Sequence, residues 1–253
     1  MPQGTVLSSS QSPSTKVELE KMNGIPYASA IGSIMYAMLC TRPDVSYALS
    51  MTSRYQQNPG ESHWMAVKNI LKYLRRSKDM LLIYGGLEED LNVKCYTDAS
   101  FQTDRDDCKS QSGFVFIMNG GAVSWKSSKQ EVVAQSTTES EYVAASEAAK
   151  EAAWMKKFIE DLGVVPSIQD PLEVFCDNEG AIALAKEPRA HKRTRHIHRR
   201  YNFIRSKVDD GDISIRKVHT DQNLADPFTK PLPLAKHEGH ARGIGLRFSS
   251  DWI

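Results

Sequence analysis

The chain has 253 residues, enough for one or two domains, and its 32 lysines and arginines nearly balance its 31 aspartates and glutamates. This balance excludes bulk charge as the source of nucleic-acid affinity, so any such binding must come from local basic patches. The most apolar run, residues 28–40, contains serine and glycine and is too short to span a bilayer. The composition therefore indicates neither a membrane protein nor a uniformly basic one.

The chain start and the cysteines indicate the compartment. Residues 1–22 are rich in serine, threonine and glutamine, and they lack the basic start and apolar stretch of a signal peptide, so we expect a polar tail. Cys40, Cys95, Cys108 and Cys176 form no Cys-x-x-Cys pair, and Cys95 and Cys176 lie in strand-like runs as small core residues. This usage indicates a reducing, intracellular compartment with neither disulfides nor structural zinc.

Residues 23–86 have helical patterns. One helix is predicted over residues 44–55, with Pro43 near its start and an Asn58-Pro59-Gly60 turn after it. The next helix has an apolar face made of Trp64, Val67, Leu71 and Leu74. Gly85-Gly86 ends the helical pattern, and we place a domain boundary there, between residues 86 and 87.

From residue 87 to residue 253, strands and helices are mixed. Asn119-Gly120 joins two strand-like runs and is typical of a type I′ hairpin, because these residues tolerate positive φ. Strands are predicted over residues 91–98, 113–118, 122–125, 172–176 and 212–218. Helices are predicted over residues 138–162, 179–186 and 195–208, and from residue 226. This order predicts a mixed sheet with helices packed on it.

Two aspartates follow strands of this pattern. Asp98 ends the first strand and Asp177 ends the fourth. If these strands are parallel neighbours, their carboxyl ends meet where ligands bind in open α/β sheets. The simpler alternatives are a solvated turn residue for Asp98 and a helix N-cap for Asp177.

The helix after the hairpin offers two glutamates, and its periodicity distinguishes them. Steps of three and four residues from Glu141 pass apolar positions, which are Ala145, Ala148, Ala152, Met155, Ile159 and Leu162. The same steps from Glu139 pass polar positions, so Glu141 is predicted to face the sheet, where a carboxylate needs a partner such as a metal. Both glutamates also fit a capping box, with Ser136 for Glu139 and Thr138 for Glu141.

The last carboxylate of interest is Asp226, which precedes Pro227. An N-cap aspartate followed by proline is an ordinary helix start, and that is the alternative reading. Upstream lies His219, which by itself would be an ordinary surface histidine. A fold that gathers the carboxylates must neutralise their repulsion, which predicts a divalent-cation pocket built from Asp98, Glu141, Asp177 and Asp226.

In this order the motifs resemble the ribonuclease H domain of Pol polyproteins from copia-type LTR retrotransposons. The residues that carry the resemblance are Tyr96-Thr97-Asp98-Ala99-Ser100, Gly121-Ala122-Val123-Ser124-Trp125-Lys126-Ser127, Ser136-Thr137-Thr138-Glu139-Ser140-Glu141-Tyr142, Cys176-Asp177-Asn178, Arg193-Thr194-Arg195-His196-Ile197 and Ala225-Asp226-Pro227-Phe228-Thr229-Lys230. The resemblance covers residues 91–233. Residues 24–80 resemble the segment that connects reverse transcriptase to ribonuclease H in such polyproteins.

The resemblance implies an α/β fold, with a mixed five-stranded sheet flanked by helices, behind an N-terminal helical segment. It implies an endonuclease that hydrolyses the RNA strand of RNA–DNA hybrids. Its metal ligands would be Asp98, Glu141, Asp177 and Asp226, holding two Mg²⁺, with Mn²⁺ as a substitute, to activate water and stabilise the leaving oxygen. His219 would assist product release, although it lies closer in sequence to Asp226 than the corresponding histidine does in many cellular members. Ser100 and Asn178 would contact the nucleic acid.

Residues 191–200 form the main basic patch, from which Arg193, Arg195, Arg199 and Arg200 are predicted to contact phosphates. The alternative for such a charge run is a solvated helix face. Expected partners are the hybrid and the reverse transcriptase portion of the same polyprotein, in a cytoplasmic virus-like particle or the nucleus, with no membrane. We expect the helical segment to expose a docking surface that includes Trp64 and Leu71. The alternative function is a catalytically inactive remnant that binds nucleic acid or other parts of the polyprotein.

Overall fold

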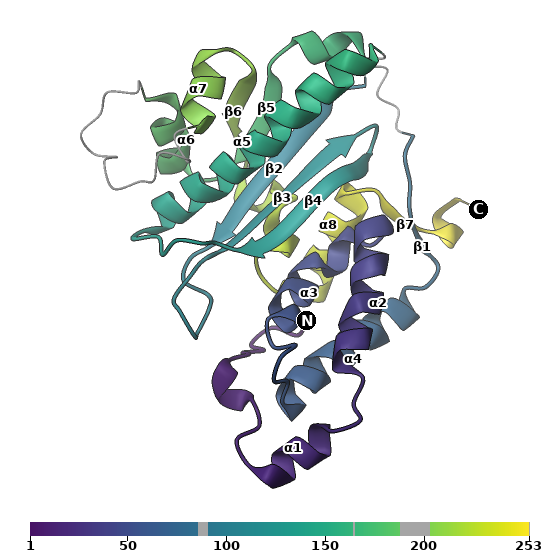
Figure 1. The fold of residues 1–253 in the computed structure, drawn as a ribbon. Coiled ribbons are helices and arrows are strands. Elements are labelled where there is room, and N and C mark those ends of the chain that lie inside the picture. The colour runs from purple at the N-terminus through teal and green to yellow at the C-terminus, as the bar shows by residue number, and fades with distance from the viewer. Residues whose placement is uncertain (86–90, 164, 188–202, 253) are drawn as a thin grey trace.

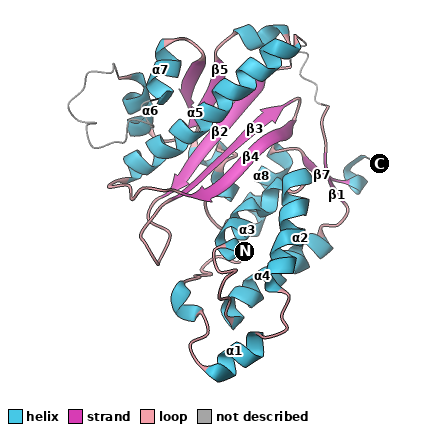
Figure 2. Ribbon diagram, viewed as in Figure 1, coloured by secondary structure: helices cyan, strands magenta, loops and turns pink. Residues whose placement is uncertain are grey.

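The computed structural model describes residues 1–85, 91–163, 165–187 and 203–252, and it has a five-stranded sheet with helices on both faces (Figure 1). The strands, magenta in Figure 2, follow the spatial order β4-β3-β2-β5-β6. Their bounds are β2 (Val93–Ser100), β3 (Gln111–Met118), β4 (Gly121–Lys129), β5 (Leu172–Cys176) and β6 (Ile213–Lys217). Because β2 runs antiparallel to β3 but parallel to β5, the sheet is mixed, as predicted.

The predicted hairpin joins β3 and β4. Asn119 has φ of 50° and Gly120 has φ of 76°, so both central residues take the positive values that a type I′ turn requires. The local turn chemistry therefore sets the register of these two strands, apart from a bulge at Phe116 and Ile117.

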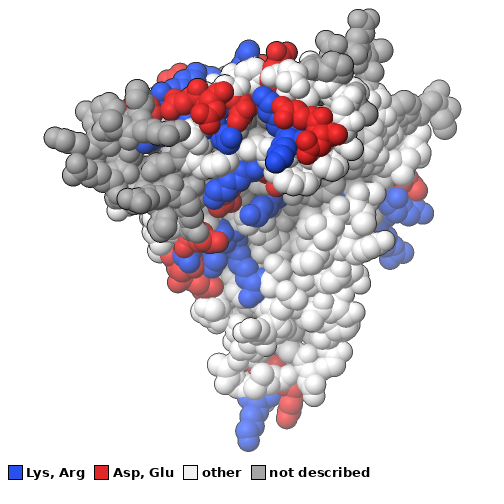
Figure 3. Space-filling model, turned by 45° about the horizontal axis from the view of Figure 1, so that its top comes forward, with Lys and Arg blue, Asp and Glu red and all other residues white. Residues whose placement is uncertain are grey.

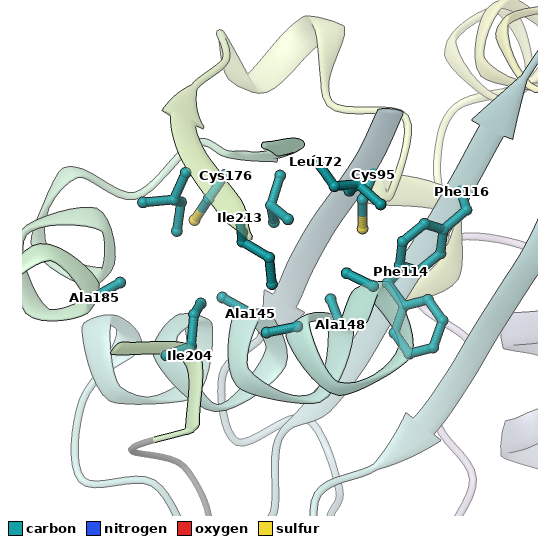
Figure 4. Close-up of a cluster of buried hydrophobic side chains, with 14 of the residues drawn as sticks. Cys95, Phe114, Phe116, Ala145, Ala148, Leu172, Cys176, Ala185, Ile204 and Ile213 are labelled. Carbon is teal, nitrogen blue, oxygen red and sulfur yellow. The ribbon is translucent and has the colours of Figure 1, made fainter. Parts of the chain in front are cut away.

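One face of the sheet is covered by three helices, α5 (Thr137–Leu162), α6 (Glu179–Lys186) and α7 (Phe203–Asp209). Figure 4 shows the resulting core, with Cys95 and Cys176 on the sheet and Ala145 and Ala148 on α5. Both cysteines are fully buried, as predicted, and the four cysteines of the chain, all at described positions, are free. The apolar stripe of α5 is confirmed except at Leu162, which is 54% exposed because it is the last residue of the helix.

The opposite face is covered by the C-terminal part of the chain. It contains the short 3-10 turn η7 (Asp226–Phe228), the helix α8 (Leu234–Gly243) and the strand β7 (Leu246–Phe248). The strand β7 pairs antiparallel with β1 (Met80–Leu82), so the chain end returns to the N-terminal segment. The side chains that pack here are Val115, Ala122, Phe228, Ala241, Ile244 and Leu246.

The N-terminal segment forms four helices, α1 (Lys16–Met22), α2 (Tyr27–Cys40), α3 (Ser46–Ser53) and α4 (Glu61–Arg76), seen below the sheet in Figure 1. Trp64 packs against the core of this segment, near Tyr27, and only Leu71 of the expected docking pair is exposed, at 39%. The predicted boundary is crossed by contacts, because Trp125 of β4 donates its indole N–H to the sulfur of Met38 at 3.4 Å.

Residues 1–22 pack more closely than a polar tail would. Leu7 is buried, and the imidazole Nε2 of His63 lies 3.1 Å from the carbonyl oxygen of Ser8. The backbone N–H of Ser9 donates to the Asp106 carboxylate at 2.9 Å. By contrast, α1 has no buried residue.

Within the described residues no helix is long and apolar enough to cross a membrane.

Candidate metal centre

The first two carboxylates lie at neighbouring strand ends. The strands β2 and β5 are adjacent and parallel, with Tyr96 opposite Phe175, so their carboxyl ends meet at one edge of the sheet. Asp98 near the end of β2 is 1% exposed, and Asp177 directly after β5 is half-buried. The capping alternative for Asp177 is wrong, because Asn178 is the N-cap of α6 and accepts a hydrogen bond from the N–H of Ala181 at 2.9 Å.

The helix α5 places Glu141 toward the sheet, as its periodicity predicted. Glu141 is 7% exposed, and its Oε2 is buried without a hydrogen-bond partner among the described residues. Glu139 does the capping work instead: its N–H donates to Ser136 Oγ at 3.1 Å and its carboxylate accepts from the N–H of Gln135 at 2.9 Å. A buried carboxylate oxygen without a donor is a position for a cation.

The turn η7 places Asp226 in the same pocket. Ala225 is the N-cap of this turn, so the alternative that Asp226 is the cap is wrong. The side chain of Asp226 is fully buried. Gly113 makes this approach feasible: it lies opposite Asp98 in the register, and a Cβ atom there would come within 2.6 Å of Phe228 Cβ. Glycine on β3 therefore allows η7 to pack beside Asp98.

Together these elements gather the four predicted carboxylates. One carboxylate oxygen each from Asp98, Asp177 and Asp226 lie within 4.8 Å of one another. Oxygens of Glu141 and Asp177 and the sulfur of Cys176 form a second group within the same limit, so Asp177 belongs to both. Hard carboxylate oxygens are the ligands that Mg²⁺ and Mn²⁺ prefer, so this donor set and the unpartnered Glu141 oxygen fit such a cation.

Two lysines neutralise part of this charge, and neither was predicted as a site residue. Lys230 Nζ lies 2.9 Å from Asp226 Oδ1 and 3.4 Å from Asp98 Oδ2. Lys236 Nζ lies 3.0 Å from Asp226 Oδ2. The hydroxyl of Thr229 donates to Asp98. The signal for Lys230 was available, because it follows Asp226 by four residues, a spacing at which side chains often meet.

Burial and mutual repulsion change the acidity of the pocket. Burial raises the pKa of Asp98 to about 6, an effect that Lys230 opposes and Asp226 reinforces. Burial also raises the pKa of Glu141 well above its ordinary value, helped by the charges of Asp98 and Asp177. For Lys230, burial disfavours the ammonium, but Asp98 and Asp226 outweigh it and raise the pKa. The two lysines therefore do not stabilise the carboxylate anions fully, which favours an added cation.

Two relatives resemble the chain along most of its length. The chain is 46% identical over 240 residues to the retrovirus-related Pol polyprotein from transposon TNT 1-94 of Nicotiana tabacum, which covers 95% of this chain and 18% of that protein. It is 35% identical to the Pol polyprotein from transposon RE2 of Arabidopsis thaliana, over 87% of this chain and 15% of the relative. The chain belongs to the copia-type retrotransposon Pol family. It spans less than a fifth of the length of these relatives.

Two further comparisons complete this picture. No protein-family model matches the chain. Among solved structures, ribonuclease H1 from the archaeon Halobacterium salinarum matches 55% of this chain and 94% of its own, with 20% identity and a TM-score of 0.37. The ribonuclease H-like fold of this copia-type Pol segment is evident from its mixed sheet of five strands and the helices on it.

The remaining predicted residues of the Pol segment lie outside the carboxylate cluster or outside the described residues. The side chain of His219 is 73% exposed, and its Nδ1 accepts a hydrogen bond from the N–H of Asp221 at 3.3 Å. Asp221 also pairs with Lys236 at 3.2 Å, so His219 reaches the pocket only through intermediaries. Ser100 is half-buried at the end of β2. The four arginines, Arg193, Arg195, Arg199 and Arg200, lie outside the described residues.

Proposed function

We propose that the chain is a divalent-metal-dependent endonuclease that hydrolyses the RNA strand of RNA–DNA hybrids. The observation that carries the proposal is the gathering of Asp98, Asp177 and Asp226 within 4.8 Å, beside the buried Glu141, at the edge of a ribonuclease H-like sheet. Membership in a family of reverse-transcribing elements supports the hybrid as substrate, because such elements produce RNA–DNA duplexes. Selection of the RNA strand would use its 2′-hydroxyl groups.

Each residue has a defined part in this proposal. Asp98, Asp177 and Asp226 would hold one divalent cation, and Glu141 with Asp177 would hold a second. Bound cations of this kind activate a water molecule and stabilise the leaving oxygen of a phosphodiester. Thr229 orients the Asp98 carboxylate through its hydroxyl, and Asn223 ties the η7 region to β2 by donating to the carbonyl oxygen of Thr97 at 3.0 Å.

The direct test is a cleavage assay with the purified chain. RNA–DNA hybrid, duplex RNA and duplex DNA of one sequence would each be incubated with Mg²⁺, with Mn²⁺ and with EDTA. The proposal expects cleavage of the RNA strand in the hybrid alone, dependent on the metal and abolished by EDTA. Hybrid binding without cleavage would favour the inactive remnant, and cleavage that persists in EDTA would reject the metal mechanism.

Phosphate contacts by the basic segment make a separate prediction. Positive and negative side chains are interspersed on the face in Figure 3, so that face presents no uniformly basic surface to the hybrid. Replacing Arg195 and Arg199 with alanine should weaken hybrid binding similarly for all sequences. It should also reduce the slope of log affinity against log salt by about one unit for each lost contact.

Affinity measured across a salt series checks this prediction. Arg216→Ala is a suitable control, because the Arg216 side chain is 59% exposed and pairs with Glu173 on the neighbouring strand at 2.9 Å. An unchanged slope in the Arg195 and Arg199 variant would show that these arginines do not contact phosphates, and it would favour the alternative of a solvated charge run.

We also propose that α2 is the docking surface for the polymerase portion of the polyprotein. None of the 14 residues of α2 is charged, and only one side of the helix packs against the core. The other side exposes Tyr36 at 75%, Leu39 at 63% and Met35 at 38%. An uncharged helix with large apolar side chains on its outer side is normally covered there, and the family relatives carry much more chain than this segment.

A double variant tests this surface. Tyr36→Ser with Leu39→Ser should leave folding and hybrid cleavage unchanged, and should weaken binding to the purified polymerase portion by about tenfold or more. Trp154→Ser is the matched control, because Trp154 is 60% exposed but lies on α5 across the sheet. Equal binding by the double variant and the control would rule out α2 as the docking surface.

A further inference from the structure

One ammonium group bridges the two most buried carboxylates of the pocket. Lys230 Nζ lies 2.9 Å from Asp226 Oδ1 and 3.4 Å from Asp98 Oδ2, whereas Lys236 Nζ divides between Asp226 Oδ2 at 3.0 Å and the exposed Asp221 at 3.2 Å. The side chains of Asp98 and Asp226 are 2% and 0% exposed, so water screens them little. Lys230 therefore supplies the nearest positive charge that these two buried anions share.

We propose that Lys230 is a displaceable counter-ion of the metal site. It offsets part of the negative charge of Asp98 and Asp226 while no divalent cation is bound, and it leaves them when a cation binds. This inference rests on the metal site of the proposed function, and it adds a residue that lowers metal affinity while supporting the fold without metal.

The ammonium and a divalent cation would compete for the same oxygens. Asp98 and Asp226 are two of the three aspartates whose oxygens lie within 4.8 Å of one another. A Mg²⁺ or Mn²⁺ ion binds carboxylate oxygen at about 2–2.2 Å, so an ion on the Asp226 Oδ1 that Lys230 contacts at 2.9 Å would lie no more than about 5 Å from the present position of the ammonium. Two cations at that separation repel strongly in a buried pocket, because the effective dielectric is far below that of water.

Lys230 is also built to leave. Its ammonium is carried on a flexible four-carbon stem, and its side chain is 33% exposed, in contrast to the buried aspartates. Rotation about the side-chain bonds can carry the ammonium into solvent without moving the backbone. The carboxylates, held by β2 and η7, stay in place as ligands.

Lys230→Met tests the proposal, with Lys230→Gln as a second variant that keeps hydrogen-bonding capacity without the charge. Lys207→Met is the matched control. Lys207 lies on α7, away from the carboxylate pocket, and its side chain is 25% exposed and pairs with Asp212 at 2.8 Å. Calorimetric titration with Mg²⁺ and with Mn²⁺ gives the affinity of each protein. Thermal unfolding in EDTA and in saturating Mg²⁺ gives its stability in each state.

Both Lys230 variants should bind Mg²⁺ about tenfold more tightly than the parent, since the competing charge is gone. In EDTA their unfolding midpoint should fall by about 3–6 °C, and saturating Mg²⁺ should restore it, because the metal replaces the lost charge. Lys207→Met should leave the metal affinity unchanged.

The contrary outcomes separate the two proposals. Parent-like or weaker Mg²⁺ binding in the Lys230 variants would overturn the displacement proposal and leave the metal site intact. Variants that stay unfolded in Mg²⁺ as well as in EDTA would overturn it too, since the metal would then fail to replace the ammonium. If neither the parent nor the variants bind a divalent cation, the metal site of the proposed function is rejected together with the counter-ion.

Discussion

Replacing Asp98 with asparagine is expected to reduce hybrid cleavage by at least about 100-fold while leaving the fold intact. Asp98 is buried between β2, β3 and η7, and asparagine keeps its shape but loses the negative charge that a cation needs. The measurement is single-turnover cleavage of the hybrid in Mg²⁺, with circular dichroism as the control for folding. Parent-like cleavage would show that the metal site is wrongly assigned.

The same variant should keep or increase stability in EDTA. Burial raises the pKa of Asp98 from 3.8 to about 6, so the folded state binds its proton more tightly than the unfolded state does. The resulting stabilisation is fully present below about pH 3.8, and it is lost as the pH rises through about 6. Asp98→Asn has no such titration, so its advantage over the parent in EDTA should grow between pH 4 and pH 7, by up to about 2 kcal/mol.

Urea unfolding of both proteins in EDTA across this pH range measures that difference. A variant that is less stable than the parent at pH 7 would show that the ion pair with Lys230 outweighs the burial of the Asp98 charge. The repulsion argument for a metal in this pocket would then be weakened.

Glu141→Gln is expected to reduce cleavage by at least about 100-fold, whereas Glu139→Gln should stay within about threefold of the parent. Two residues of the same type, one half-turn apart on α5, make an internally matched pair. Glu141 is buried with a free oxygen in the pocket, and Glu139 is half-buried and accepts a hydrogen bond from the N–H of Gln135 at 2.9 Å.

The loss of folding stability should be larger for Glu139→Gln than for Glu141→Gln, which is the reverse of their losses in cleavage. Glu139→Gln should lose a few tenths to about 1 kcal/mol, because it weakens a helix cap. Glu141→Gln should not be destabilised in EDTA, because burial already disfavours its charge. Equal losses of cleavage in the two variants would contradict the assignment of Glu141 to the metal site.

Periodicity and turn chemistry were sufficient for the parts of the fold that depend on local sequence. The Asn119-Gly120 hairpin and the buried side of α5 follow from positive φ and from helical spacing, and both were predicted. The motif order also predicted which four carboxylates the fold would gather. The hairpin and the helix stripe are local or repeat at a short period, so they can be recognised without knowing what packs against them. The four carboxylates were grouped by the resemblance to ribonuclease H.

Other features depend on contacts between distant segments and left only weak local signals. In the sequence, Gly113 is an ordinary strand residue. The structure shows that η7 packs on it, and the close approach of Phe228 requires glycine there. Lys230 reads as one of many surface lysines until Asp98 is known to lie beside Asp226. The docking surface was expected at Trp64 and Leu71, yet Trp64 packs against the core of the N-terminal segment. The larger exposed apolar side chains, Tyr36 and Leu39, lie on α2, which has no charged face to mark its outer side in the sequence.

The pairing of β1 with β7 has a consequence for synthesis of the chain. Met80–Leu82 is made well before Leu246–Phe248, because all five strands of the large sheet lie between them in the sequence. Until then, the backbone N–H and C=O groups of β1 that β7 will occupy have no strand to pair with, and an unpaired edge strand is a site for mispairing. The helical segment therefore cannot complete its hydrogen bonding as an independent unit. A chain truncated before Leu246 would keep β1 without its partner strand.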